Sequence, residues 1–214
     1  MSYRRLSTLL LVVLHLGACT PYAVHTSAQP LRQGEQTSTT IATVVPQGAK
    51  FDDSSSQAMP SIDWEKRVGL DDRSDAGLRI NSLSGAILTY KRRLDGPSAR
   101  QTTATAIMVG AGFVNMGQHA HGEVTLITSA PDSGRSVIPY GGVRLVQIAP
   151  LSTDAVHDKP TIGLFGGSRF GGRDGNVAVE LGVFYDRSAL GLRRNDIVIV
   201  PSVSFTGMSW RRMR

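Results

Sequence analysis

The sequence has a single cysteine and no apolar run long enough to cross a bilayer as a helix. A lone cysteine excludes an internal disulfide, so any exported domain must be stable without one. The run Leu9–Leu14 is short, whereas a transmembrane helix needs roughly 20 apolar residues. No helix-length segment repeats its apolar residues with the helical period of about 3.6. These absences exclude a disulfide-stapled fold and a helical membrane span, and they disfavour an all-α domain.

The N-terminus has the order of an export signal. Arg4 and Arg5 form a positively charged start, and the apolar run Leu9–Leu14 follows. The next residues, Leu16-Gly17-Ala18-Cys19, resemble the lipobox of bacterial lipoproteins, in which small residues admit a signal peptidase and the cysteine carries lipid. The resemblance covers about the first twenty residues.

This resemblance implies that residues 1–18 are a signal peptide and that Cys19 is lipidated. In lipoprotein sorting, Asp after the cysteine favours the inner membrane, and this chain has Thr20 there. The resemblance therefore implies a lipid-anchored protein of the bacterial outer membrane. An ordinary secretory signal with an incidental Cys19 is the alternative.

The segment after the cysteine differs in composition from the rest of the chain. Residues 19–60 are rich in Ser, Thr, Gln and Ala and carry few large apolar side chains, which predicts a disordered tether. For residues 61–77 we expect a short helical or irregular segment, because Ser61 can cap a helical turn that contains Asp63 and Glu65.

Residues 78–210 have runs of period two separated by turn residues, which predicts an antiparallel all-β domain. The clearest run is Asn176–Asp186. Its apolar residues share one face and its small or charged residues share most of the other: Val177, Val179, Leu181, Val183 and Tyr185 against Ala178, Glu180, Gly182, Phe184 and Asp186.

Two architectures fit this alternation. A soluble sandwich or lipocalin-like barrel buries its apolar face, whereas a small outer-membrane barrel turns that face to lipid and fills a narrow lumen with small and paired charged residues. Small residues at Ala106, Gly110, Gly112, Ala178 and Gly182 favour the second, in which Glu180 and Arg144 or Arg169 are candidate lumen charges. We therefore predict an up-and-down barrel of about eight strands, followed by a basic tail at 211–214.

Two features bear on this choice from opposite sides. Aromatic residues near strand ends, among them Tyr140, Tyr185 and Phe205, are typical of an interfacial girdle, and the last run resembles the aromatic-ended terminal strand of outer-membrane proteins. Pro139 and Pro201 instead favour edges or bulges. Because a closed barrel has no edge, these prolines count against it unless they lie at bulges.

Residues with possible chemistry are few. His119 and His121 lie two apart, so on a strand they share a face with Glu123 and form a weak metal candidate, against the alternative of a polar loop. Ser129, Ser133 and Ser136 follow these histidines, as a lipid A-modifying hydrolase would require, but the spacing has no distinctive motif. The prediction is a protein that is not an enzyme and has no cofactor.

The basic pairs Arg92-Arg93 and Arg193-Arg194 fall at expected strand ends, where they are candidates for contact with lipid phosphates. The modest net charge of +6 suits anionic envelope partners such as lipopolysaccharide, or envelope proteins, rather than nucleic acid. The function expected is structural, adhesive or export-accessory. The alternative is a periplasm-facing module that binds a hydrophobic or glycan ligand.

Overall fold

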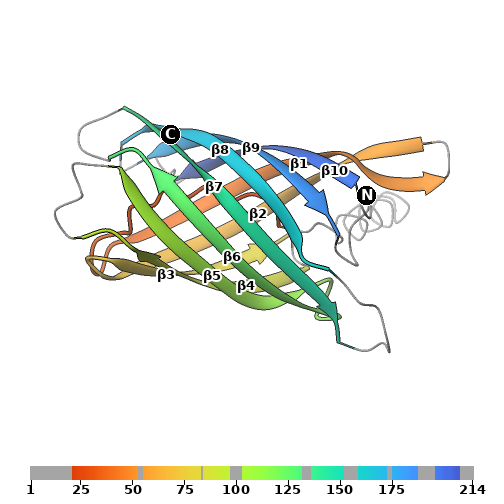
Figure 1. Cartoon of the computed structure of the whole chain (residues 1–214), viewed down its shortest axis with the longest axis horizontal. Coiled ribbons are helices and arrows are strands. Elements are labelled where there is room, and N and C mark those ends of the chain that lie inside the picture. The colour runs from red at the N-terminus through yellow and green to blue at the C-terminus, as the bar shows by residue number, and fades with distance from the viewer. Residues whose placement is uncertain are drawn as a thin grey trace, which may run out of the picture.

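The described residues form a closed antiparallel β-barrel (Figure 1). The computed structural model describes residues 21–52, 55–82, 84–96, 103–131, 136–151, 159–172, 175–187 and 196–207. Ten strands make the wall: β1 (Gln36–Asp52), β2 (Ser55–Asp71), β3 (Ser74–Asn81), β4 (Gly85–Arg93), β5 (Ala104–Val114), β6 (His119–Ser129), β7 (Val137–Pro150), β8 (Thr161–Gly171), β9 (Asn176–Asp186) and β10 (Asp196–Thr206). Within these ranges no helix is long and apolar enough to cross a membrane.

The topology is a simple up-and-down meander. Each strand pairs with its neighbours in the sequence, and β1 closes the barrel by pairing with β10 from Thr39↔Thr206 to Thr43↔Ser202. We call the end of the barrel where β1 begins and β10 ends the first rim, and the end where β9 leads to β10 the second rim. The β2–β3 turn lies at the first rim because successive strands run in opposite directions.

The apolar face of each strand points outward. In β9, Val179, Leu181 and Val183 are 53%, 51% and 42% exposed, whereas Ala178, Glu180 and Phe184 are buried. In β5, Val109 and Phe113 are exposed and Ala106 and Met108 are buried. The predicted inversion of faces is confirmed. A soluble module would have required the same valines and leucine at the centre of the body.

The barrel has ten strands rather than the eight predicted, because the wall begins earlier in the chain. The expected disordered tether at 19–60 is wrong over its described residues, since most of residues 21–28 are buried inside the barrel and β1 and the first part of β2 follow from residue 36. The polar composition that suggested disorder belongs to lumen-facing positions such as Thr39 and Thr43, which are buried. A strand with a polar inner face does not need many apolar residues.

The short helical or irregular segment expected at 61–77 is also wrong, because β2 and β3 cover this range except for a turn. Ser61, Asp63 and Glu65 are buried while Ile62 and Trp64 are exposed, which is the alternation of a strand. The acidic residues that suggested a first helical turn are lumen charges. Residues 1–18, Cys19 and the basic tail 211–214 lie outside the described residues.

Two prolines are accommodated where the hydrogen-bond ladder ends on one side. Pro201 pairs with Leu181 of β9, but the β1–β10 register stops at Ser202. Pro139 pairs with Ser168 of β8, and the β6–β7 register stops at Tyr140. The missing N–H of each proline therefore costs the closed wall little.

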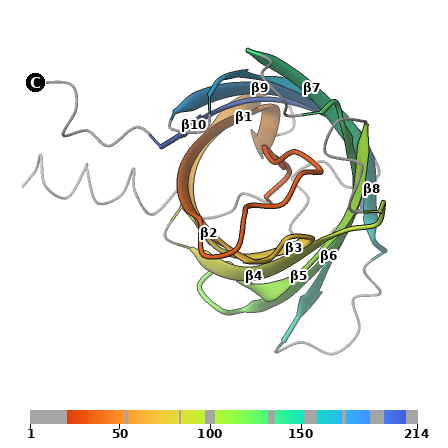
Figure 2. The same ribbon diagram turned by 90° about the vertical axis from the view of Figure 1, so that its left-hand side faces the viewer.

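The lumen is occupied by the chain itself. Residues 21–35 precede β1 and run inside the ring of strands, as Figure 2 shows in a view along the barrel. Tyr22, Ala23, Val24 and Ala28 are all almost fully buried. We call residues 21–32 the luminal segment.

Candidate functional site: a charged lumen and the segment it holds

A network of ion pairs lies inside the first-rim half of the barrel. Arg67 on β2 donates from Nη1 to Glu65 Oε1 at 2.7 Å and from Nε to Asp75 Oδ1 at 3.0 Å. Asp75 on β3 also lies 3.1 Å from Nζ of Lys91 on β4. Arg79 reaches Glu65 at 3.4 Å. All five side chains are almost fully buried, so each charge depends on its partners rather than on water.

A second group of charges crosses from β6 to β7. Glu123 accepts hydrogen bonds from Arg144 Nη2 and, at 2.9 Å, pairs with His121 Nε2. The alternation of β6 sends His121 and Glu123 to the same inner face, as their spacing predicts. These residues are buried, and the arginine continues from here to the luminal segment.

The arginines bind the main chain of the luminal segment. Arg144 Nη1 donates to the carbonyl oxygens of Tyr22 and Ala23 at 2.8 and 2.9 Å. Arg79 donates to the carbonyl oxygens of Ala23 and Val24 at 2.7 and 3.3 Å. Two guanidinium groups, one from β3 and one from β7, therefore hold the same short stretch of backbone.

A carboxylate binds the neighbouring N–H groups. Glu180 on β9 accepts a hydrogen bond from the Val24 amide at Oε1 and from the His25 amide at Oε2, both at 2.8 Å. Hydrogen bonds to a charged acceptor are among the stronger ones in proteins. The segment is thus held between cations that bind its carbonyl groups and an anion that binds its amides.

The contacts continue to the first rim. Lys91 Nζ donates to Thr26 Oγ1 at 2.8 Å and to the carbonyl oxygens of Ser27 and Gln29 at 3.0 and 3.3 Å. The Ala28 amide donates to Ser129 Oγ at 3.2 Å. The Leu31 amide donates to Asp75 Oδ2 at 3.1 Å.

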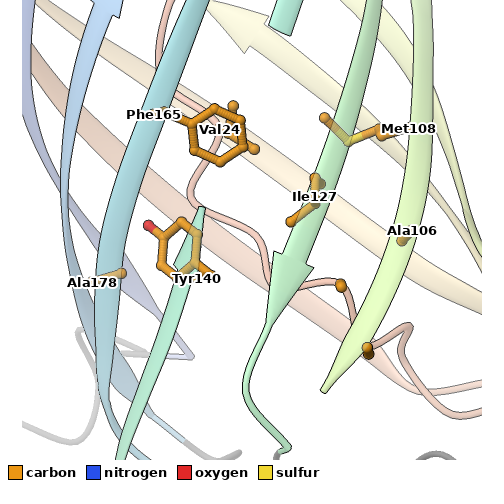
Figure 3. Close-up of a cluster of buried hydrophobic side chains, with 9 residues drawn as sticks. Val24, Ala106, Met108, Ile127, Tyr140, Phe165 and Ala178 are labelled. Atoms are coloured by element: carbon orange, nitrogen blue, oxygen red, sulfur yellow. The ribbon is translucent and has the colours of Figure 1, made fainter. Parts of the chain in front are cut away.

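Apolar contacts surround the same segment. Val24 packs in a buried cluster, shown in Figure 3, with residues from five strands and with Ala28: Ala104, Ala106, Met108, Ile127, Tyr140, Phe165 and Ala178. Nearer the second rim, Tyr22 joins Val45, Phe184, Val198 and Val200, and its ring lies 5.0 Å from that of Phe184. The segment fits the lumen by packing as well as by charge.

A small cavity remains between the segment and the wall at the first rim. Its volume is about 70 Å³, and its lining includes His25, Glu65, Arg67, Asp75 and Lys91. This space holds on the order of two water molecules and is far below the several hundred Å³ of a typical ligand pocket.

The histidines expected to be candidates for a metal do not gather ligands. Over the described ranges, no group of three His, Cys, Asp or Glu residues is placed to hold a metal ion. His119 lies 3.3 Å from Asn115 Nδ2, and His121 pairs with Glu123. Both belong to β6, so the alternative of a polar loop is wrong.

The structure also separates the residues of the hydrolase alternative. Ser129 and His121 lie eight residues apart on β6, which separates them by roughly 26 Å. A different serine does meet a histidine, since Ser202 Oγ lies 2.8 Å from His25 Nε2. His25 Nδ1 has no hydrogen-bond partner within the described part of the chain, so no third residue orients the ring.

The expected phosphate contacts are divided. Arg92 is exposed on the outer face, but Arg93 points into the barrel and donates to Gln29 Oε1 at 3.1 Å. Its position follows from the alternation of β4, which buries every second residue. Tyr140, expected in the girdle, is likewise buried in the lumen. Arg193, Arg194 and Ser133 lie outside the described residues.

Sequence reasoning missed most residues that hold the luminal segment. Arg79 and Asp75 were not singled out, although each lies at an inward position of a strand. The available signal was the alternation of charged with apolar residues in Ile62-Asp63-Trp64-Glu65. Glu180 and Arg144 were recognised as possible lumen charges, and the structure confirms that both point inward.

Comparison with known proteins gives only distant structural likenesses. No protein-family model and no curated protein matches the sequence. Neisserial surface protein A is 13% identical, over 80% of this chain and 93% of that chain, with a TM-score of 0.34. The N-terminal β-barrel domain of Pseudomonas aeruginosa OprF is 13% identical, over 81% and 99%, with a TM-score of 0.32. The outer membrane protein OprG from Pseudomonas aeruginosa is 11% identical, over 86% and 100%, with a TM-score of 0.30.

Proposed function

We propose that the protein is a non-enzymatic outer-membrane lipoprotein whose barrel spans the bilayer and whose lumen is filled by its own N-terminal segment. The observation that carries this proposal is the division between an apolar outer face and a paired, charged inner face. A soluble protein has the opposite arrangement, because water outside favours polar side chains there.

The outer belt runs around the whole wall. Every strand contributes at least one exposed, large apolar side chain: Val44, Ile62, Leu78, Leu88, Val109, Leu126, Leu145, Leu164, Leu181 and Ile199. A continuous belt of this kind exceeds the scattered apolar patches of soluble monomers. Strands of about 9 to 11 residues suffice to cross the hydrocarbon core of a bilayer.

Exposed aromatic residues flank the belt at both rims. Phe113 and Tyr185 lie near the second rim, and Phe170 and Phe205 lie near the first. Aromatic side chains favour the two interfaces of a bilayer, where an apolar ring can sit beside polar headgroups. This arrangement supports a membrane-spanning wall with Arg92 available for a lipid phosphate just beyond it.

The lipid anchor is the second part of the proposal and rests on the lipobox resemblance at Leu16–Cys19. In the mature chain, Cys19 would then lie only two residues ahead of Pro21, where the described luminal segment begins. The role proposed is structural or adhesive within the envelope, or accessory to export, with lipopolysaccharide or envelope proteins as partners. The buried and mutually paired lumen charges give no support for catalysis.

The experiment compares the full chain with its Cys19→Ala variant. We expect loss of metabolic palmitate labelling in the variant, whereas both proteins should still require detergent. Both should migrate faster on a gel unheated than heated, because a folded membrane barrel keeps its shape in detergent. Solubility of the variant in plain buffer would contradict the spanning barrel, and unchanged labelling would contradict the anchor.

A further inference from the structure

The luminal segment occupies the lumen along the height of the barrel. The segment reaches from one end of the barrel to the other. Tyr22 packs against Phe184 and Val198, each two residues from the β9–β10 connection at the second rim. Leu31 binds Asp75, beside the β2–β3 turn at the first rim. Nine residues can reach at most about 30 Å, and the roughly 25 Å height of a tilted strand of this length lies within that limit even with the turn of the backbone at His25.

The wall recognises this segment mainly through its backbone. Arg79, Arg144 and Lys91 bind carbonyl oxygens, and Glu180 and Asp75 bind amides. Every non-proline residue offers these same groups, so the binding does not depend on one special side chain. The most deeply buried side chains of the segment are small or compact: Ala23, Val24 and Ala28.

Without the segment, the space it occupies would not be filled by the wall. The hydrogen-bonded ladder is closed around the barrel and fixes its diameter. Arg79, Arg144 and Glu180 would lose their backbone partners while remaining inside. A polar cavity lined by such charges takes up water, because unpaired charges in a dry space are far more costly.

The segment is also attached at one end by a turn. Gly34 has a φ of +77°, and its amide donates to the Gly69 carbonyl oxygen at 2.9 Å. The Glu35 amide donates to the Arg32 carbonyl oxygen at 2.9 Å. The chain therefore reverses at the first rim before β1 begins, and the luminal segment can leave without disturbing the β1 ladder.

We propose that the luminal segment is a removable plug and that the lumen it vacates is a water-filled passage that conducts ions across the membrane. This inference rests on the proposed function, since it needs a barrel that spans a bilayer. The occupant of the closed state is the chain's own residues 21–32.

The first test measures K⁺ conductance in planar lipid bilayers containing KCl. The full-length protein is compared with a variant that lacks residues 22–31 and keeps the signal and Cys19. We expect discrete conductance steps from the deletion variant and a closed wild-type barrel. A synthetic peptide with the sequence of residues 21–32 should close the variant. A matched peptide with proline in place of Val24 and His25 should not, because it lacks the two amides that Glu180 binds.

The second test uses point variants, so that it does not depend on the folding of the deletion variant. Glu180→Gln keeps the shape of the side chain and removes its charge, and the open fraction should rise by about tenfold or more. The matched control is Asp186→Asn, which changes a buried carboxylate that accepts from Thr161, and it should stay closed. A disulfide between Ala28→Cys and Ser129→Cys should hold the Glu180→Gln barrel closed until it is reduced.

The outcomes separate the two proposals. Heat-modifiable migration reports the membrane barrel, and conductance reports the plug. A folded Glu180→Gln barrel with wild-type conductance overturns the plug, as does a folded deletion variant that neither conducts nor binds the peptide. A wild-type barrel that conducts as well as the deletion variant overturns it too.

Discussion

The outer face and the lumen of the same wall place different demands on the side chains. On the outer face the exposed side chains include many valines, leucines, isoleucines and phenylalanines, and in the proposed membrane-spanning barrel lipid would accept any apolar shape. In the lumen, each charge has particular partners, as Asp75 does in Arg67, Lys91 and the Leu31 amide. A barrel of this size is therefore stabilised by a generic exterior and a specific interior. Substitutions on one face at a time test this difference.

The largest effect is expected from removal of a shared lumen charge. Asp75→Ala leaves Lys91 without its carboxylate and Arg67 with only Glu65, both in a buried site. Loss of one member of a buried ionic group typically lowers the free energy of unfolding by about 3 to 5 kcal/mol. Urea titration in lipid vesicles, followed by tryptophan fluorescence, measures the loss.

The double variant Asp75→Ala with Lys91→Met is its control. Removing the stranded cation should restore part of the stability, because the remaining lumen is closer to neutral. A loss below about 1 kcal/mol for Asp75→Ala would mean that water screens the lumen charges as it screens surface pairs. The contrast between the two faces would then be much weaker than the burial of these groups indicates.

The next largest effect is on the outer face. Leu181 lies at the middle of β9 and is 51% exposed, so Leu181→Arg puts a charge near the centre of the belt. At the bilayer midplane this change costs about 2 to 4 kcal/mol, falling to about 0 to 1 near an interface. Ile197→Arg, at the second-rim end of β10, is therefore the matched control. Equal effects of the two variants in vesicle unfolding would show that depth along the wall does not matter, against a spanning barrel.

The contrast between the apolar outer face and the charged lumen also explains which strands could be predicted from the sequence. The inverted face of β9 was predictable, because five large side chains share one face opposite alanine, glycine and a glutamate. Strands β1 and β2 were missed for a related reason. Their inner positions hold Thr39, Thr43, Asp63 and Glu65, which resemble a tether or a helix start unless a charged lumen is assumed.

The luminal segment could not be predicted from its own residues. Pro21 and Pro30 flank a stretch with few large side chains, which is typical of a disordered linker. What orders it is distant in the sequence: Glu180 lies 156 residues beyond Val24, and Arg144 lies 122 residues beyond Tyr22. Recognition of backbone groups leaves no pattern of side chains in the sequence. The position of the luminal segment is therefore visible only in the closed barrel.

A smaller effect is expected from a glycine pair on one strand. A Cβ at Gly163 would overlap the ring of Phe184 in the lumen, whereas a Cβ at Gly166, on the outer side of β8, would meet nothing within 4 Å. Overpacking a filled interior costs about 1 to 3 kcal/mol. Gly163→Ala should therefore be destabilised in urea titration, and Gly166→Ala should match the wild type. Equal stability of the two variants would mean that the lumen has unfilled space around the Phe184 ring.

The smallest effect is expected from the aromatic contact between Tyr22 of the luminal segment and Phe184 of the wall. Tyr22→Leu keeps an apolar side chain but removes the ring contact with Phe184, worth about 0.5 to 1.5 kcal/mol beyond burial. The hydrogen bond that Arg144 donates to the Tyr22 carbonyl oxygen does not depend on the Tyr22 side chain. Hydrogen exchange at the Val24 and His25 amides should therefore quicken only a few-fold, while exchange in β9 stays unchanged. Faster exchange in β9 as well would mean that the segment and the wall open together, and the segment would then be part of the core rather than a separate plug.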